Sequence, residues 1–326
     1  MIITRTPLRV SLGGGGTDLP SYYERYGGMV VAAAIDKYVF VSMNRTFTDD
    51  YFLKYSALER VSTREDIDHP IVREAFLAHQ VAPSVEMVSV ADIPAGTGLG
   101  SSGTFTVGLL RAINAFQRDH ATPGMLAEEA CHIEIETLGR TVGKQDQYIA
   151  AFGGFMCFTF ATDGKVTISP LAISSDTLHD LEEHLVMFFT GYSRDAEQML
   201  EDQKIRSEQG DLEMIENLHF VKSVGEQSRT ALETGDTHGF AHLMHEHWIR
   251  KRERSVGMTN DMIDQWYKRG IENGALGGKL VGAGAGGFLL FYAEDPTSLR
   301  RAMQAERLTE VRFLFDHDGS VVLARD

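Results

Sequence analysis

The sequence has little cysteine, no long apolar run and no excess of positive charge. Its two cysteines, Cys131 and Cys157, form no CxxC pair, which excludes a disulfide framework and a zinc site built from cysteines. The longest apolar runs, such as Met29 to Ile35, are far shorter than the ~20 residues of a membrane span. The first residues also lack the apolar segment of a signal peptide. We therefore expect a cytoplasmic protein with no membrane segment.

The charge balance is strongly acidic, with a formal net charge of −15. Such a surface argues against a nucleic-acid partner, and it means that any anionic ligand depends on a local basic pocket. The length of 326 residues exceeds the usual size of a single core and predicts two domains. We place them at 1–170 and 171–326, because the composition becomes more polar near Ser175. The sequence leaves the oligomeric state open.

Apolar periodicity predicts strands and helices that are segregated along the chain. In the first half, strands are expected at 2–12, 30–44, 51–55 and 85–93 and as a hairpin at 153–160 and 165–168, and helices at 19–26 and 69–79, after Gly100 and from Pro123. In the second half, helices are expected at 195–207, 213–233, 237–252, 260–273 and 297–306, and strands at 185–190, 288–292 and 310–324. This arrangement favours an α+β protein of two lobes over a doubly wound sheet.

A glycine-rich loop, IPAGTGLGSSGT from Ile93 to Thr104, precedes one of the predicted helices. Its alternating glycines carry no Cβ that would hold a ligand away from the backbone. The free N–H groups and the positive dipole end at the start of a helix both favour phosphate. The same loop is also consistent with a simple turn whose serines cap the helix.

A second glycine run, Gly13 to Gly16, follows the first predicted strand and ends in Thr17 and Asp18. Four consecutive glycines are costly in backbone entropy and are tolerated where the main chain passes close to a ligand or to another backbone. Asp18 would then be a polar group delivered to that place. The alternative is an irregular surface loop in which Asp18 caps the next helix.

The helix predicted from Pro123 onward carries a carboxylate on its apolar side. At about 100° per residue, Glu134 falls near the middle of the apolar stripe, whereas Glu136 projects to the polar side. A buried carboxylate is costly unless it is paired or bound to a metal. Glu134 is therefore either a site residue or one half of a structural salt bridge to an arginine.

Two glycine clusters match the dinucleotide-binding pattern GxGxxG, at Gly98 to Gly103 and at Gly282 to Gly287. That site requires a second parallel strand ending in an acidic residue about 20 positions on. The first cluster is followed by two helices, and the second by a strand in place of a helix. No lysine follows Gly100, so the GxxxxGK[ST] pattern is absent too. The sequence predicts neither a dehydrogenase nor a P-loop protein.

Three motifs, in this order, resemble those of the GHMP family of small-molecule kinases. They are Arg9 to Asp18, Pro94 to Ser102 and Gly282 to Gly287, with Gly143-Lys-Gln-Asp-Gln147 between the second and third. The resemblance spans residues 2 to about 292. It implies an ATP-dependent phosphotransferase with an alcohol acceptor, built from an N-terminal lobe like ribosomal protein S5 and a C-terminal ferredoxin-like, largely helical lobe.

The resemblance also implies a role for each motif residue. Asp146 would accept the proton of the attacking hydroxyl, and Arg9 would pair with it and stabilise charge on the transferring phosphoryl group. Ser102 and Glu134 would hold Mg²⁺, consistent with its preference for oxygen ligands. The ATP phosphates would lie in a loop formed by Pro94, Gly96, Gly98, Leu99, Gly100, Ser101 and Ser102. Substrate contacts are expected for Gly15, Gly16, Asp18, Gly143, Lys251, Arg252 and Gly284.

Within that family, the Gly13 to Asp18 run and the Trp248-x-x-Lys251-Arg252 stretch look like those of the heptose 7-phosphate kinases, with fucose kinases as a neighbouring group. Galactokinases carry Glu and His where Gly15 and Gly16 stand. The glycines leave more room, which favours a larger sugar. Lys251 and Arg252 lie in the densest basic run and would hold a sugar phosphate, although a solvated helix end explains that run equally well.

The resemblance thus implies phosphorylation, with ATP and Mg²⁺, of the anomeric hydroxyl of D-glycero-D-manno-heptose 7-phosphate. The product would be the 1,7-bisphosphate for nucleotide-activated heptose synthesis, and the partner a small-molecule sugar phosphate. Two alternatives remain open. One is another sugar 1-kinase, for fucose or a related hexose, and the other is a non-catalytic ligand sensor with a similar fold.

Overall fold

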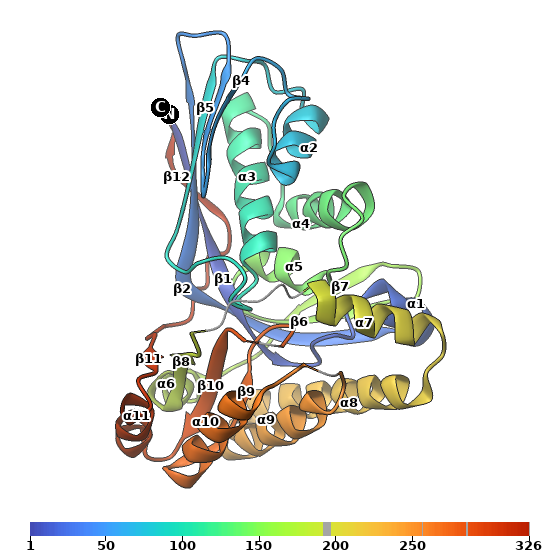
Figure 1. The fold of residues 1–326 in the computed structure, drawn as a ribbon, viewed down its shortest axis with the longest axis vertical. Helices are drawn as coiled ribbons and strands as arrows, with labels where there is room; N and C mark the ends of the chain where they lie inside the picture. The colour runs from blue at the N-terminus through green and yellow to red at the C-terminus, as the bar shows by residue number, and fades with distance from the viewer. Residues whose placement is uncertain (192–196, 256, 285, 326) are drawn as a thin grey trace.

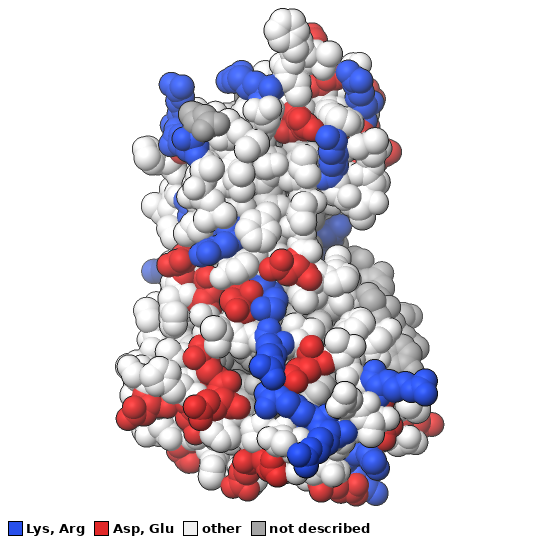
Figure 2. Space-filling model, turned by 90° about the vertical axis from the view of Figure 1, so that its left-hand side faces the viewer, with Lys and Arg blue, Asp and Glu red and all other residues white. Residues whose placement is uncertain are grey.

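The computed structural model describes residues 1–191, 197–255, 257–284 and 286–325. Its strands form two separate sheets, which Figure 1 shows in an upper and a lower lobe. In Figure 2 the molecule narrows between the lobes, and on the face shown Lys and Arg lie among Asp and Glu. The two-lobed α+β fold expected from the sequence is confirmed.

An eight-stranded sheet forms the first lobe, in the order β12-β1-β2-β5-β3-β4, with β6 beside β2 and β7 beside β6. The strands are β1 (Ile2–Gly13), β2 (Gly28–Arg45), β3 (Tyr51–Lys54), β4 (Leu58–Val61), β5 (Val85–Ala91), β6 (Phe155–Phe160), β7 (Val166–Pro170) and β12 (Val321–Arg325). The long strand β2 pairs with β6 through its first half and with β5 through its second half. Only β3 and β5 pair in parallel among the named strands.

The helices of the first lobe are α1 (Pro20–Tyr26), α2 (Pro70–Ala78), α3 (Ser101–Gln117), α4 (Pro123–Cys131), the π-helix η1 (His132–Thr137) and α5 (Gln145–Phe152). Helices α2, α3 and α4 lie on one side of the sheet (Figure 1). The side chains of Leu109 and Ile113 on α3 are buried in the core against β1 and β2, as the helical spacing of its apolar residues predicts.

The second lobe has a four-stranded antiparallel sheet in the order β11-β8-β10-β9. Its strands are β8 (Leu185–Phe189), β9 (Ala275–Leu280), β10 (Phe288–Ala293) and β11 (Thr309–Glu310). Its helices are α6 (Ser175–His184), α7 (Glu197–Glu208), α8 (Leu212–Thr234), α9 (Thr237–Arg252), α10 (Asp261–Glu272) and α11 (Pro296–Ala305). Four of these helices begin after an aspartate or asparagine whose side chain accepts a backbone N–H: Asp211, Asp236, Asn260 and Asp295.

The chain returns to the first lobe at its end, where β12 pairs antiparallel with β1. Ile2 lies opposite Arg325, so the two ends of the chain are side by side (Figure 1). Pro170 is the last residue of β7, and the strands up to β7 lie with β12 in the first sheet, whereas β8 to β11 lie in the second.

Most of the expected elements are present, within a few residues of the predicted bounds. Strand β4, helices α5 and α6, strand β9 and the π-helical turn of η1 were not predicted from the sequence. No helix of the described ranges is long and apolar enough to cross a lipid bilayer.

Candidate active site

A cavity lies between the two lobes and is lined from both. The first lobe contributes β1, the Gly15 to Leu19 stretch, the glycine-rich loop with the start of α3, and the start of α5. The second lobe contributes α7, α9 and β9, together with the turn after β9. Most of the residues singled out in the sequence meet here.

The glycine-rich loop is held open by its glycines. Gly96, Gly98 and Gly100 have φ angles of 76°, 86° and 80°, which L residues with side chains rarely adopt. A Cβ at Gly98 would also lie 2.5 Å from the carbonyl oxygen of Val281, so the loop packs directly on the second lobe. Gly100 is the residue before α3, and no side chain caps this helix. Gly100, Ser101 and Ser102, at the start of this helix, line the cavity. The free N–H groups of a helix start are suited to phosphate.

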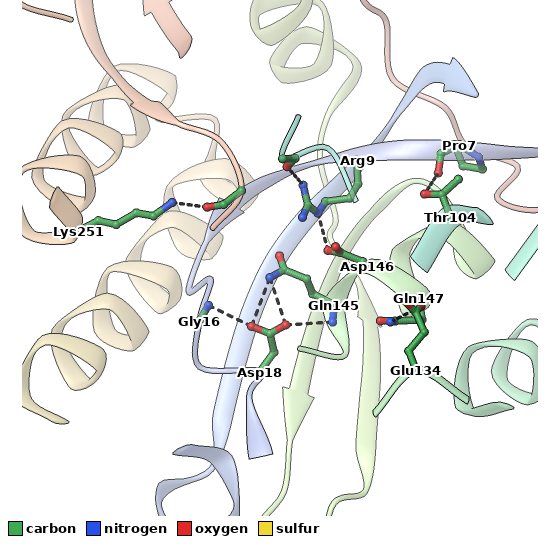
Figure 3. A network of polar contacts seen from close by, with 12 residues as sticks. Pro7, Arg9, Gly16, Asp18, Thr104, Glu134, Gln145, Asp146, Gln147 and Lys251 are labelled. Atoms are coloured by element: carbon green, nitrogen blue, oxygen red, sulfur yellow. Dashed lines mark hydrogen bonds and ion pairs between the residues drawn. The ribbon is translucent and has the colours of Figure 1, made fainter. Parts of the chain in front are cut away.

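Arg9 connects the loop to Asp146. Its Nε donates a hydrogen bond to Asp146 Oδ1 at 2.7 Å, and its Nη1 donates to the Gly98 carbonyl (Figure 3). Its backbone N–H donates to the Leu99 carbonyl at 3.1 Å. Arg9 is buried, whereas the Asp146 carboxylate stays 26% exposed at the start of α5. One side chain thus fixes a cavity carboxylate relative to the loop.

Close packing of α3 on α5 sets the position of Asp146. A Cβ at Gly103 would lie 2.8 Å from Asp146 Cβ, so only glycine allows this approach. Thr104, the next residue of α3, donates a hydrogen bond to the Pro7 carbonyl of β1 at 3.1 Å (Figure 3). The strand that carries Arg9 and the helix that follows the loop are therefore tied together.

Asp18 is buried and accepts hydrogen bonds from the backbone N–H groups of Gly16 and Gln145 at 3.0 and 3.1 Å (Figure 3). Burial raises the pKa of its carboxyl above the usual value, although these N–H donors oppose the shift. A Cβ at Gly143 would come within 1.9 Å of Asp18 Oδ2, so this glycine leaves the space that the carboxylate occupies. Helix α1 has Leu19 as its N-cap, so Asp18 is not a capping residue.

Glu134 is completely buried in η1, as its place on the apolar stripe predicts. Its carboxylate accepts hydrogen bonds from Thr106 and Gln147 at 3.0 and 2.9 Å and from the Ser102 hydroxyl. Burial raises the pKa of this carboxyl, and the hydrogen bonds and Arg140 oppose the rise. Arg140 lies 3.5 Å from Glu134 and also donates to Ser102, so both anticipated partners of Glu134, a serine and an arginine, are present.

The wall contributed by the second lobe is basic. His247 and Lys251 lie one turn apart on α9, Arg254 follows the end of that helix, and Lys279 lies on β9. All four are buried. Burial and the neighbouring positive charges lower the pKa of Lys251 well below its usual value and that of Lys279 to about 7.

Most expected site residues line this cavity, including Gly15, Gly16, Ser101 and Lys251. Glu134 lies directly behind Ser102. The structure does not bring four others to the cavity wall. Pro94 is exposed, Leu99 takes part through its backbone carbonyl only, Gly284 packs against Met258, and Arg252 lies 3.9 Å from Asp264 in a separate surface groove.

Sequence reasoning missed several lining residues. Gln145 holds Asp18, and Gln203 on α7 donates a hydrogen bond to the Gly16 carbonyl at 2.8 Å. His247 and Lys279 come from distant parts of the chain and give no local motif. A signal for Lys279 was present, because a lysine within the apolar stretch of β9 is expected to be buried and therefore to have a specific role.

A loop and helix start suited to phosphate, a carboxylate held by an arginine, and a buried hydroxyl–carboxylate pair together define a small-molecule kinase. Family models agree. The model described as GHMP kinases N terminal domain matches residues 70–154, and the model described as GHMP kinases C terminal matches residues 228–308. The chain belongs to the GHMP kinase family, whose members use ATP, and it is a phosphotransferase with an alcohol acceptor.

Individual relatives cover the whole chain. It is 33% identical to the D-glycero-alpha-D-manno-heptose 7-phosphate kinase of Campylobacter jejuni, over 98% of this chain and 97% of that protein. A crystal structure of a D-glycero-D-manno-heptose 1-phosphate kinase from Bacteroides thetaiotaomicron superimposes with a TM-score of 0.81, at 25% identity over 100% of both chains. That of a sugar kinase described as putative from C. jejuni gives 0.78, at 29% identity over 98% of this chain and 97% of that one.

Proposed function

We propose that this kinase transfers the γ-phosphoryl group of ATP to the anomeric hydroxyl of D-glycero-D-manno-heptose 7-phosphate and so forms the 1,7-bisphosphate. The observation that carries the proposal is the Arg9–Asp146 pair, placed between the glycine-rich loop and a basic cavity wall. The pair provides a base beside the phosphate site, and the wall suits an acceptor that is itself an anion. The 33% identical relative from C. jejuni supports the choice of sugar.

Asp146 is the proposed general base. Its carboxylate has one oxygen on Arg9 Nε and retains exposure to the cavity, so it can accept the proton of a sugar hydroxyl. Arg9 keeps that carboxylate in place and presents its guanidinium, through the Gly98 carbonyl, at the edge of the loop. A fixed cation at this position stabilises charge on the phosphoryl group during transfer.

Asp18 is the proposed sugar-orienting group. Its backbone donors hold the carboxylate rigidly, and Gly15 and Gly16 line the cavity beside it without side chains of their own. A rigid hydrogen-bond acceptor fixes the sugar so that one of its hydroxyls meets Asp146. Such positioning is a main source of catalysis in phosphoryl transfer.

Ser102 and Glu134 are the proposed protein ligands of Mg²⁺. The donor set fits, because Mg²⁺ takes one or two protein oxygens and completes its shell with phosphate and water. Glu134 is buried with three side chains donating to its oxygens, and Arg140 stands beside it as the positive charge. When bound, the metal supplies positive charge to the phosphates. Among the described residues no cluster of three or more His, Cys, Asp or Glu offers a metal site.

The proposal is tested by measuring ADP release from ATP with a panel of phosphorylated and free heptoses and hexoses. We expect heptose 7-phosphate to give the highest kcat/KM. NMR of the product should place the new phosphate on the anomeric carbon. A panel in which a free hexose is the best acceptor would contradict the proposed substrate and leave the kinase class intact.

A fucose-type sugar 1-kinase is the second candidate. The fucokinase/GDP-fucose pyrophosphorylase of Arabidopsis thaliana is 24% identical over 91% of this chain, although the chain spans only 30% of that protein. An uncharged acceptor would give no role to the buried basic wall. The same panel separates the two candidates, because fucose carries no phosphate.

A further inference from the structure

Two buried groups of the second-lobe wall have polar atoms without a partner among the described residues: both ring nitrogens of His247, and Nη2 of Arg254. Lys279 is a further buried side chain that lines the same cavity. His247, Arg254 and Lys279 are almost completely buried, with exposed fractions of 2%, 5% and 2%. Unsatisfied buried polar groups are costly, and their concentration in one cavity wall indicates a ligand that satisfies them.

The basic side chains of the cavity favour an anion as that ligand, because a negative charge beside them stabilises their protonated forms. Arg9, Lys251, Arg254 and Lys279 line it, against two acidic side chains among the described residues, Asp18 and Asp146. Asp146 already accepts a hydrogen bond from Arg9, and Asp18 already accepts hydrogen bonds from several N–H groups. Buried charges that serve structure alone are normally paired, whereas Lys251, Arg254 and Lys279 form no salt bridge with the described residues.

The wall has one end at the glycine-rich loop and the other at Asp18. Lys251 lies at the loop end, since its ammonium donates to the Gly282 carbonyl and Gly282 packs directly on Gly98. Arg254 lies at the other end, since a Cβ at Gly16 would be 2.7 Å from its Nη1.

Arg254 is held rigidly at that end. Its Nε donates to Asn217 at 3.0 Å and its Nη1 donates to Gln203 at 3.1 Å, while Gln203 in turn holds the Gly16 carbonyl. Nη2 of this guanidinium has no hydrogen-bond partner among the described residues and is left for a ligand. A fixed arginine of this kind is well suited to a phosphate oxygen.

We propose that His247, Arg254 and Lys279 bind the phosphate group that the acceptor sugar carries before the reaction, and that they set the preference for phosphorylated over free sugars. This inference rests on the proposed function, because it takes the acceptor to be a sugar phosphate. Lys251 lies at the loop end, and we assign it neither to the phosphates of ATP nor to the phosphate of the sugar. The name phosphate wall is used below for His247, Arg254 and Lys279.

The test compares kcat/KM for heptose 7-phosphate with kcat/KM for the same heptose without its phosphate, at saturating ATP. In Arg254→Gln and in Lys279→Gln, we expect the ratio of the two values to fall about 10-fold or more, as for a lost charged hydrogen bond. The KM for ATP should stay within about twofold of wild type. Arg252→Gln is the matched control, because it removes the same charge two residues from Arg254 but outside the cavity.

The results that would overturn the assignment are specific. A rise in the KM for ATP with an unchanged sugar ratio would assign the wall to the triphosphate. An equal fall in the ratio of kcat/KM values in Arg252→Gln would show that the effect does not depend on a position in the cavity wall. If Arg254→Gln fails to fold, Arg254→Lys replaces it, because lysine keeps the charge but loses the planar geometry. A wild-type ratio of kcat/KM values both in Arg254→Lys and in Lys279→Gln would contradict the proposal.

Failure of the proposed function is distinguishable. If wild-type enzyme phosphorylates only free sugars, the proposed function fails, and the phosphate wall fails with it. If wild type prefers heptose 7-phosphate and the wall variants keep that preference, the phosphate wall alone is wrong. Calorimetric binding of heptose 7-phosphate without ATP, which should weaken in both variants, checks the assignment without turnover.

Discussion

Arg9 shows how much one side chain in this site determines. It is buried in β1, donates to Asp146 through one nitrogen and to the glycine-rich loop through another, and its backbone N–H also holds the loop. Sequence reasoning paired Arg9 with Asp146 by resemblance. Its two contacts with loop carbonyls depend on three-dimensional proximity and leave no trace in residue type or spacing.

Replacement of Asp146 by asparagine should lower kcat by about 10²-fold or more, the contribution typical of a general base. Asparagine keeps the size of the side chain and its place beside Arg9, so ATP binding should be retained. Single-turnover kinetics and ATP titration by fluorescence would measure the two quantities. Turnover close to wild type would remove Asp146 from the proposed mechanism.

Lys279 should make binding of the sugar phosphate depend on pH. Burial, with Arg9 as a positive neighbour, lowers the pKa of Lys279 to about 7, so the free enzyme loses this charge as the pH rises above 7. His247, Lys251 and Arg254 are the other basic groups facing it from the α9 side. The phosphate has its second pKa near 6 and stays doubly charged above pH 7. The KM for heptose 7-phosphate should therefore rise between pH 7 and pH 9.

Lys279→Arg is the control for that assignment. Arginine keeps its proton throughout this range, so the rise in KM should become flatter in this variant. Initial rates at fixed ionic strength with saturating ATP would give both profiles. Identical profiles for the two proteins would show that the pH dependence belongs to another group.

At the level of elements, the sequence predicted which side of the turn η1 is buried, but it did not predict that the backbone there is π-helical. A regular helix of about 100° per residue put Glu134 on the buried side and Glu136 on the polar side, and both expectations are confirmed. The backbone there is π-helical, a form often found at functional sites. Apolar spacing indicates the buried side of a helix and is too coarse to register one widened turn.

Glu134→Gln should raise the Mg²⁺ concentration needed for half-maximal activity and lower kcat about 10-fold or more, because a neutral amide is a poorer ligand for a hard cation. Glu136→Gln is the matched control, since Glu136 lies two residues on and is 70% exposed. Activity measured against Mg²⁺ at fixed ATP separates the two variants. Equal Mg²⁺ requirements in both would remove Glu134 from the metal site.

Other elements were missed because their sequence signals conflict. Helix α5 begins in the polar stretch Gln145–Gln147, which has the composition of a loop, and continues into an apolar run too short to assign. Strand β9 contains two glycines and a lysine, which are all uncommon in strands. Both elements are set by tertiary packing: α5 packs on α3 at Gly103, and β9 pairs with β10.

For the whole molecule, the two-lobed fold could be predicted because each lobe has its own pattern of strands and helices. The cavity between the lobes could be predicted mainly on its first-lobe side, which carries most of the motif residues. On the second-lobe side, Lys251 was an expected residue that does line it. The phosphate wall combines residues from α9, the segment after it and β9. No spacing rule relates them, so it appeared only in the structure.

The pairing of β12 with β1 predicts a measurable contribution to stability. Deletion of 321–325 would leave the backbone groups of Ile2 to Arg5 unpaired along one edge of the first sheet. We expect the midpoint of thermal unfolding to fall by several degrees, as measured by calorimetry, with kcat at low temperature close to wild type. An unchanged midpoint would show that β12 contributes little.

The same pairing has a consequence for biosynthesis. The first lobe, which holds the glycine-rich loop and Asp146, obtains its edge strand β12 only after the entire second lobe has left the ribosome. The lobes therefore cannot mature strictly in the order in which they are translated. The emerging first lobe must wait with β1 open until β12, which is translated after the second lobe, closes the sheet in which Arg9 lies.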